Sequence, residues 1–383
     1  MEYKTILIKN GNLLDVETGN IEKKDILIID GTVKQIETNI CASADKTIDA
    51  QDMYITPGWV DAHAHVFSKD DMLGVSPDEN HLQKGVTCVV DPGSSGSDNY
   101  NVLREDIFAK VKTLCYGFLN CSRTGIHIES LSGAGELSDE SLFDENSLIE
   151  VYNKYRDELL GIKIRLTPNV CPKNGYELLK KASLVSAKLS VPLEVHPNFA
   201  EMKCEELFGQ LKKNDIYTHM YHDSPVGILD ENGKIKDCVL EARKRGVIFD
   251  VAHGVSSMSF KVMKKALEQG FEPDMISTDL HNANVNGPVY DLATTISKFL
   301  CAGMPLEKAI YKVTKAPVEI LNIRNKSYKI EVGQKADITG FVIDSNEHKY
   351  TDACNYVLKG NYKVITKFTV LKNDFYDACL FWQ

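Results

Sequence analysis

A chain of 383 residues is too long for one ordinary core, but a TIM barrel takes about 250 residues and leaves room for one small partner domain. The composition, with 43% hydrophobic and 26% charged residues, is typical of a globular protein and excludes general disorder. The formal net charge of -10 and the lack of a clustered basic face exclude a nucleic-acid partner and favour a small molecule.

The two ends of the chain carry short β-type runs separated by turn residues. The runs lie at 5–9, 25–29, 337–343 and 362–370. The dipeptides Asn10-Gly11 and Asp30-Gly31 are hairpin signals, and no long helical period interrupts either end. We therefore expect residues 1–55 and 331–383 to form together one small β-sandwich domain.

The middle of the chain, residues 56–330, alternates short apolar runs with helical stretches. Eight strands are predicted, at 59–65, 86–91, 115–120, 162–166, 193–196, 216–219, 247–253 and 275–279. Helical stretches lie between or after them, at 176–190, 261–269 and 305–313. This alternation is typical of repeated βα units around a parallel sheet, so we expect an α/β fold with a (β/α)8 TIM barrel.

The ten cysteines, from Cys41 to Cys379, contain no Cys-x-x-Cys pair, and several lie within apolar strand-like runs. They indicate reduced core residues of a cytoplasmic protein rather than a disulfide framework or a zinc ribbon. The N-terminus lacks the basic and apolar regions of a secretory signal, and no apolar run approaches the roughly 20 residues of a membrane helix. We therefore expect neither export nor membrane insertion.

Histidines gather at the ends of the predicted strands. Of the ten in the chain, seven lie at or shortly after a strand end, namely His63, His65, His196, His219, His222, His253 and His281. In a (β/α)8 barrel these ends form one face, which is where active sites lie. Side chains two residues apart on a strand share a face, so His63 and His65 point together, as do Lys163 and Arg165.

Each of these residues also has a structural explanation when it is taken alone. A single strand-end histidine such as His196 or His219 is more often a hydrogen-bonded core or rim residue. Lys163 could be a strand-end lysine that reaches solvent, and Asp279 could cap the next helix. The joint pattern favours a metal site, because these are metal-ligand residue types and they match strands 1, 4, 5, 6 and 8 in order.

Short motifs connect these residues to a known family. They are ITPGWVDAHAH at 55–65, GVT at 85–87, DPGS at 91–94, GIKIR at 161–165, THMYH at 218–222, GILD at 227–230, FDVAHG at 249–254, STDLH at 277–281, NGPVYDL at 286–292 and GQKADI at 333–338. With these motifs the chain resembles the amidohydrolase superfamily, and within it the dihydroorotase-like amidohydrolases and deacetylases.

The resemblance implies six ligands for two divalent cations. They are His63, His65 and Asp279 for the first cation, His196 and His219 for the second, and Lys163, carboxylated by carbon dioxide, as the bridge between them. The carbamate requires a neutral amine, and burial beside cations lowers the pKa of a lysine. We expect zinc, although these ligands also accept manganese, iron or cobalt.

The same resemblance implies a mechanism. A hydroxide shared by the two cations would attack a carbonyl, and Asp279 would act as general base and then as general acid. Four residues are candidates for substrate binding, namely Arg165, His281, His253 and Asn286. Arg165 would hold a substrate carboxylate, or would instead brace the carbamate or another acid.

We expect hydrolysis of an acyl group, acetyl above all, from a small carboxylate-bearing amide or ester. The alternative is ring opening of a cyclic amide or imide, as in dihydroorotases and hydantoinases. True dihydroorotases carry an arginine two residues after the second histidine of the His-x-His motif, and here that position is Phe67. Mononuclear deaminases lack the strand-4 lysine, so Lys163 argues against them. A non-catalytic scaffold is disfavoured because all six ligand positions are filled, and a homo-oligomer is left open.

Overall fold

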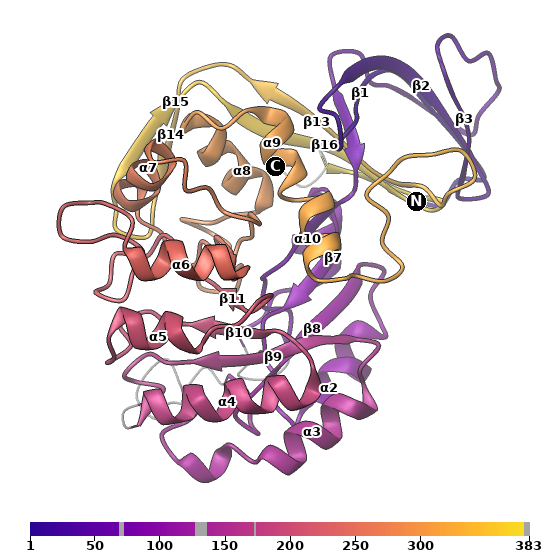
Figure 1. Cartoon of the computed structure of the whole chain (residues 1–383). Helices are drawn as coiled ribbons and strands as arrows, with labels where there is room; N and C mark the ends of the chain where they lie inside the picture. Colours follow the sequence, from indigo (N-terminus) through magenta and orange to yellow (C-terminus); the bar gives the residue numbers. More distant parts are fainter. Residues whose placement is uncertain (69–72, 127–135, 172–173, 379–383) are drawn as a thin grey trace.

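The computed structural model describes residues 1–68, 73–126, 136–171 and 174–378. Figure 1 shows a curled parallel sheet flanked by helices and a second β layer at one end, which contains the N-terminus. Cys379, one of the ten cysteines of the sequence, lies outside the described residues. Within the described part, no helix is long and apolar enough to cross a membrane.

The curled sheet has seven parallel strands in the order β12-β11-β10-β9-β8-β7-β6. Their bounds are β6 Trp59–Asp61, β7 Val86–Asp91, β8 Leu114–Asn120, β9 Leu159–Arg165, β10 Leu193–His196, β11 Ile216–Tyr217 and β12 Ile248–Phe249. Residues 275–280 complete the circle, because Met275 forms a parallel bridge with Asp250 and Leu280 forms one with Ala64. The α/β barrel predicted from the sequence is confirmed.

The predicted strands differ most from the structure where the chain reaches the barrel rim. β7 and β10 have the predicted bounds, whereas the first, sixth and seventh strands end earlier and the eighth forms only the two bridges. The backbone turns into the left-handed region at His219 (φ 59°), Ala252 (φ 37°) and Asp279 (φ 51°). Such a conformation is strained for non-glycine residues and ends strand pairing, so it redirects these side chains at the rim.

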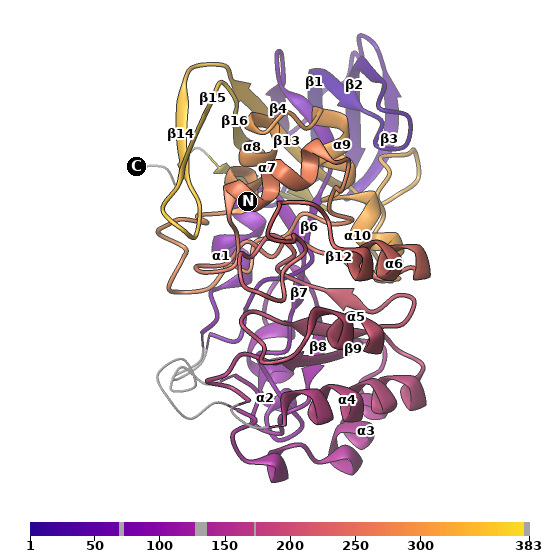
Figure 2. The same cartoon turned by 60° about the vertical axis from the view of Figure 1, so that its left-hand side comes forward.

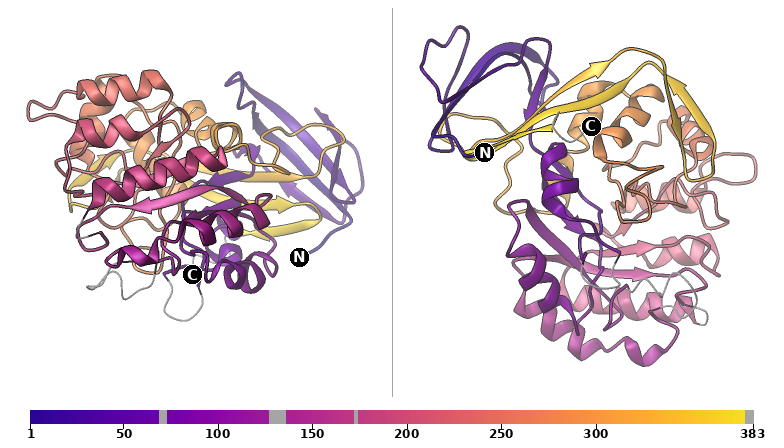
Figure 3. Two further views of the ribbon diagram at one scale, coloured as in Figure 1. Left: turned by 60° about the horizontal axis from the view of Figure 1, so that its bottom comes forward. Right: turned by 180° about the vertical axis from the view of Figure 1, so that it is seen from behind.

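Helices cover the outside of the sheet, and α3 to α6 lie side by side along it (Figures 1 and 3). The helix bounds are α1 Pro77–Asn80, α2 Tyr100–Leu103, α3 Glu145–Lys154, α4 Gly175–Leu189, α5 Cys204–Gln210, α6 Asp237–Arg245, α7 Phe260–Glu268, α8 Leu292–Cys301, α9 Leu306–Tyr311 and α10 Lys315–Ile320. The three predicted helical stretches correspond to α4, α7 and α9. α4 buries Leu178, Ala182 and Val185, the three-to-four-residue spacing of an amphipathic helix.

Both ends of the chain build the second sheet, as predicted. Its strand order is β17-β16-β13-β5-β1-β2-β3, and β4 pairs with β1. The bounds are β1 Thr5–Leu14, β2 Ile21–Ile29, β3 Thr32–Glu37, β4 Lys46–Asp49, β5 Tyr54–Pro57, β13 Asp337–Asp344, β16 Lys363–Leu371 and β17 Asp374–Asp377. Asp30-Gly31 forms the predicted turn, between β2 and β3. Asn10-Gly11 does not, because it lies inside β1, where the register with β2 shifts.

A separate hairpin of β14 (His348–Thr351) and β15 (Val357–Gly360) lies against the barrel. Figure 2 shows it at the side of the barrel away from β1 to β3. The turn of the hairpin is hydrogen-bonded to the start of α7 and the residues just before it, since Ala353 N donates to Met258 O at 3.0 Å and Phe260 N donates to Asp352 Oδ2 at 2.6 Å. Residues from the C-terminal part of the chain therefore reach the barrel directly.

Candidate metal centre

The predicted ligands meet at the C-terminal ends of the barrel strands. A cavity there is lined by His63, His65, Leu73, Ile126, Lys163, Arg165, His196, Val255, Ser256, Ser257, Asp279 and His281. Five of the six predicted ligands are in this lining. The sixth, His219, is the immediate neighbour of His196, with ring centroids 4.2 Å apart.

His63, His65 and Asp279 form a compact buried cluster, with one potential ligand atom from each lying within 4.8 Å of the others. The Nε2 atoms of His63 and His65 lie 3.7 and 3.3 Å from Asp279 Oδ1. Although burial alone would raise it, the pKa of Asp279 is held well below its usual range by His65, His63 and His219. Asp279 is therefore a carboxylate.

The outer partners of these histidines determine which ring nitrogen carries the proton. Ser94 Oγ donates to Asp91 Oδ2 at 2.7 Å, so it accepts from His65 Nδ1 at 2.6 Å. His63 Nδ1 lies 3.0 Å from Glu194 Oε1, a carboxylate that can only accept. In the neutral imidazoles the Nε2 lone pairs of both histidines then face Asp279 Oδ1. Two imidazole nitrogens and a carboxylate oxygen that converge in this way form a donor set that divalent cations accept, so this cluster fits a metal ion.

His196 and His219 form a second pair next to this cluster. His219 Nδ1 lies 2.7 Å from Ala252 O and must donate to that carbonyl, which leaves the Nε2 lone pair directed at His196 Nδ1, 2.9 Å away. Burial lowers the pKa values of both imidazoles well below the usual value. Neighbouring positive groups add to this at His196, whereas at His219 the carboxylate of Asp279 opposes it in part. Both rings are therefore in the neutral form that metal ligation requires.

Lys163 is fully buried in β9 and forms an ion pair with Glu194 of β10. Glu194 also contacts His63, so the amine lies beside the first cluster. Although burial alone would raise it, Lys163 and His63 lower the pKa of Glu194 to about 2. Sequence reasoning missed Glu194. Its signal was a charged residue inside a buried strand, two positions before His196 and hence on the same face.

Asp61, the last residue of β6, is hydrogen-bonded to the segment that carries Asp279. Its Oδ1 accepts from Thr278 N at 3.0 Å and its Oδ2 accepts from Thr278 Oγ1 at 2.5 Å. Thr278 immediately precedes Asp279. The first strand therefore holds the backbone that presents the carboxylate of Asp279.

The four predicted substrate-binding residues have different surroundings. Arg165 lines the cavity, and its Nη1 donates to both carboxylate oxygens of buried Glu136, at 3.1 and 3.2 Å. His281 also lines the cavity, and burial lowers its pKa to about 4. His253 is fully buried and Asn286 is exposed, and neither is among the described residues that line the cavity.

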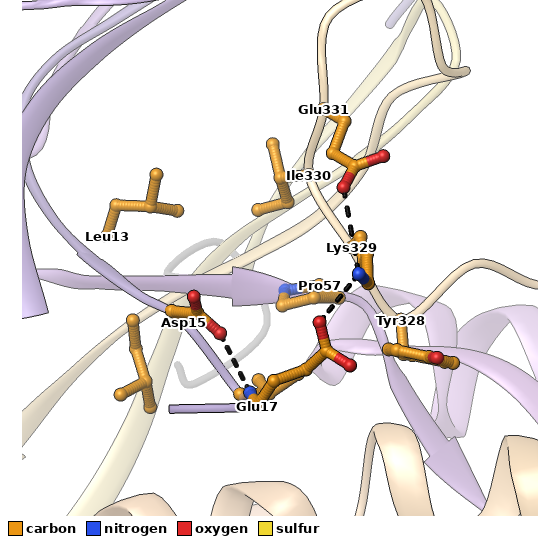
Figure 4. A pocket seen from close by; sticks show the side chains of 10 residues that line it. Leu13, Asp15, Glu17, Pro57, Tyr328, Lys329, Ile330 and Glu331 are labelled. Atoms are coloured by element: carbon orange, nitrogen blue, oxygen red, sulfur yellow. Dashed lines mark hydrogen bonds and ion pairs between the residues drawn. The ribbon is translucent and has the colours of Figure 1, made fainter. Parts of the chain in front are cut away.

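Another cavity lies between the ends of β1 and β5 and the segment before β13 (Figure 4). Its charged residues neutralise one another, since Glu17 lies 2.7 Å from Lys315 and 2.6 Å from Lys329. Hydrogen bonds from these two lysines lower the pKa of Glu17 to about 2. No histidine or cysteine is among the described residues of its lining. Within the described part of the chain, the group that could hold a metal ion is the cluster of His63, His65 and Asp279.

Comparison with known proteins agrees with the fold and with the family that the sequence motifs indicated. The model of the amidohydrolase family matches residues 54–375. A deacetylase of Enterococcus faecalis is 34% identical over 381 residues, covering 98% of this chain and all of that protein. The crystal structure of a dihydroorotase superposes with a TM-score of 0.90 at 30% identity, covering 98% of each chain. The crystal structure of an adenine deaminase gives 0.87 at 33% identity, covering 97% of this chain and 99% of that one.

A parallel barrel whose rim carries a buried histidine and carboxylate cluster is the arrangement of a metal-dependent hydrolase. The chain belongs to the amidohydrolase family. Its relatives include deacetylases, as the sequence motifs indicated.

Proposed function

We propose that the protein hydrolyses an acyl group, acetyl above all, from a small amide or ester that carries a carboxylate. The observation that carries the proposal is the buried cluster of His63, His65 and Asp279 beside the pair of His196 and His219. The similarity to deacetylases supports the choice of an acyl substrate.

The two groups of histidines would hold two divalent cations, with zinc as the expected metal. Bound there, the cations would make a water molecule more acidic and polarise the acyl carbonyl. Lys163 would bridge them after its amine has bound carbon dioxide, since a carbamate offers two oxygen ligands where the amine offers none. The burial of Lys163 and its position beside His63 support this role. Because Lys163 is paired with Glu194, the ammonium group would first have to give up a proton, and Glu194 is the neighbouring carboxylate that could accept it.

Asp279 would carry the proton. Its Oδ1 faces the two histidines of the cluster, whereas its Oδ2 lies on the other side, next to Gly254, where a Cβ would be only 2.4 Å away. One oxygen can thus serve as a ligand while the other takes a proton from the attacking water and delivers it to the leaving group.

Arg165 would bind the substrate carboxylate. It is in the cavity lining, and Glu136 holds it through Nη1. A guanidinium has three nitrogens, so it can keep this contact and still bind a second carboxylate. The proposed partner of the protein is accordingly a small acylated acid, and His281 would lie next to it.

The second candidate is ring opening of a cyclic amide, which the similarity to the dihydroorotase structure favours. The purified protein should be tested with N-acetyl amino acids and O-acetyl hydroxy acids beside dihydroorotate and hydantoins. Release of acetate with no ring opening is the expected result. Turnover of the cyclic compounds alone would replace the first candidate by the second.

A further inference from the structure

Lys298 of α8 is a buried lysine with no part in the proposed reaction. Its side chain is fully buried and forms no ion pair with any carboxylate of the described residues. Its Nζ donates instead to Pro288 O at 2.8 Å and to Thr351 O at 3.0 Å, and it lies 2.6 Å from His253 Nε2. Burying a charged amine without a carboxylate partner is costly, so the position of Lys298 beside two carbonyls and an imidazole needs an explanation.

The direction of these hydrogen bonds follows from the groups themselves. His253 Nδ1 lies 2.8 Å from Gly254 O, and a carbonyl can only accept, so Nδ1 carries the proton. Burial and Lys298 lower the pKa of His253 well below the usual value, which makes the ring neutral and leaves Nε2 as an acceptor. Burial lowers the pKa of Lys298 to about 7, and in the ammonium form its three hydrogens match these three acceptors.

Gly254 lies directly against the carboxylate of Asp279. Its φ is +57°, and a Cβ at this position would be 2.4 Å from Asp279 Oδ2. Its N–H donates to Thr278 O at 3.0 Å, while its carbonyl accepts from His253. The main chain at Gly254 is thus held from both sides and forms the surface on which Asp279 Oδ2 lies.

We propose that Lys298 and His253 are positioning residues, which hold the Gly254 main chain against Asp279 and thereby set the direction of Oδ2. The inference rests on the proposed function, in which Asp279 is both a ligand and the proton carrier. It gives His253 a role other than substrate binding. It also makes the C-terminal hairpin part of the site, because Thr351 at the end of β14 supplies one of the three acceptors.

The first test is binding of cobalt(II) to metal-free protein, measured by chelator competition and by the visible absorption of the bound ion. Lys298→Met should weaken cobalt binding by about 10- to 100-fold and change the spectrum, as loss of an outer partner does in metal sites. Lys312→Met is the control. Lys312 is also buried and donates to a carbonyl, Pro273 O, at 2.6 Å. Pro273 comes just before residues 275–280, so its carbonyl lies at the start of that barrel segment, at the end of the barrel opposite Asp279. Equal effects of the two substitutions on cobalt binding would overturn the proposal.

The second test does not depend on the folding of the lysine variant. Gly254→Ala should displace Asp279 and weaken cobalt binding by a similar factor. Gly270→Ala is the matched control, because Gly270 also has a positive φ, of +71°, but a Cβ there meets nothing within 4 Å. If Gly254→Ala binds cobalt as tightly as Gly270→Ala, the contact with Asp279 is not needed and the proposal fails.

These readouts require no substrate. If the protein released no acyl group from any compound, the proposed function would fail, while cobalt binding would still decide the role of Lys298 and His253.

Discussion

His222 is buried in the segment that follows β11, and its hydrogen bonds make folding sensitive to acid. Tyr217 Oη donates to Val226 O at 2.9 Å, so it accepts from His222 Nε2 at 2.7 Å. His222 Nδ1 in turn accepts from Ser224 Oγ at 2.7 Å and from Ser224 N at 3.2 Å. Both ring nitrogens are thus occupied in the neutral form. Burial, and to a lesser extent Lys236, lower the pKa of His222 from 6.5 to about 3.

The sign of the effect follows from proton binding. Between pH 6.5 and about pH 3 the unfolded chain binds a proton at His222 and the folded chain does not, so stability is complete above pH 6.5 and is lost as the pH falls. Each pH unit in this window corresponds to about 1.4 kcal/mol. Between pH 7 and pH 5 the contribution of His222 to the free energy of unfolding should fall by about 2 kcal/mol.

The variant His222→Asn removes the titrating group and keeps an acceptor for Ser224. Urea titrations of metal-free protein at pH 7 and pH 5, followed by circular dichroism, give the free energy of unfolding of both chains. Because the other buried histidines are present in both, their contributions cancel in the difference. The parent chain should lose about 2 kcal/mol more than the variant over this range. Equal losses in the two chains would refute the reasoning.

Three further predictions concern the metal centre. Lys163→Ala should abolish turnover, and short carboxylic acids such as acetate should restore part of it by supplying the missing oxygen ligands. If the variant turned over substrate as fast as the parent chain, the bridging role of Lys163 would be refuted. Arg165→Lys keeps a charge beside Glu136 but loses the planar guanidinium group that can bind a carboxylate through two hydrogen bonds. The KM for an anionic substrate should therefore rise about tenfold or more, with little change in thermal stability. An unchanged KM would exclude Arg165 as the residue that binds the substrate carboxylate. Ser94→Ala removes the acceptor of His65 Nδ1 and should weaken metal binding by about 10- to 100-fold. Ser95→Ala should leave metal binding unchanged, because the buried hydroxyl of Ser95 has no hydrogen-bond partner among the described residues.

Local sequence patterns predicted the bounds of two strands inside the barrel sheet, β7 and β10. β7 and β10 begin and end where their apolar runs do, because burial on both faces selects such runs. The pattern failed where the backbone is determined by tertiary contacts. Residues 275–279 have the composition of a strand but form only single bridges, and Asn10-Gly11 forms an irregularity inside β1 rather than a turn.

The ligand set was predictable because its members are metal-ligand residue types at strand ends. Their partners were not, because a hydrogen bond between distant segments leaves no local pattern. Glu194 beside Lys163 and Glu136 beside Arg165 were both missed for this reason. His253 was assigned to the substrate on its position alone, whereas the structure gives both of its ring nitrogens to Lys298 and Gly254.

The central claim is that residues from five barrel segments hold two divalent cations in one site. The most direct measurement is the metal content of the purified protein, determined by elemental analysis after exhaustive dialysis. We expect two divalent cations per chain, with zinc predominant, and loss of both from a variant that carries His63→Ala and His196→Ala. A content below one cation per chain would contradict the account.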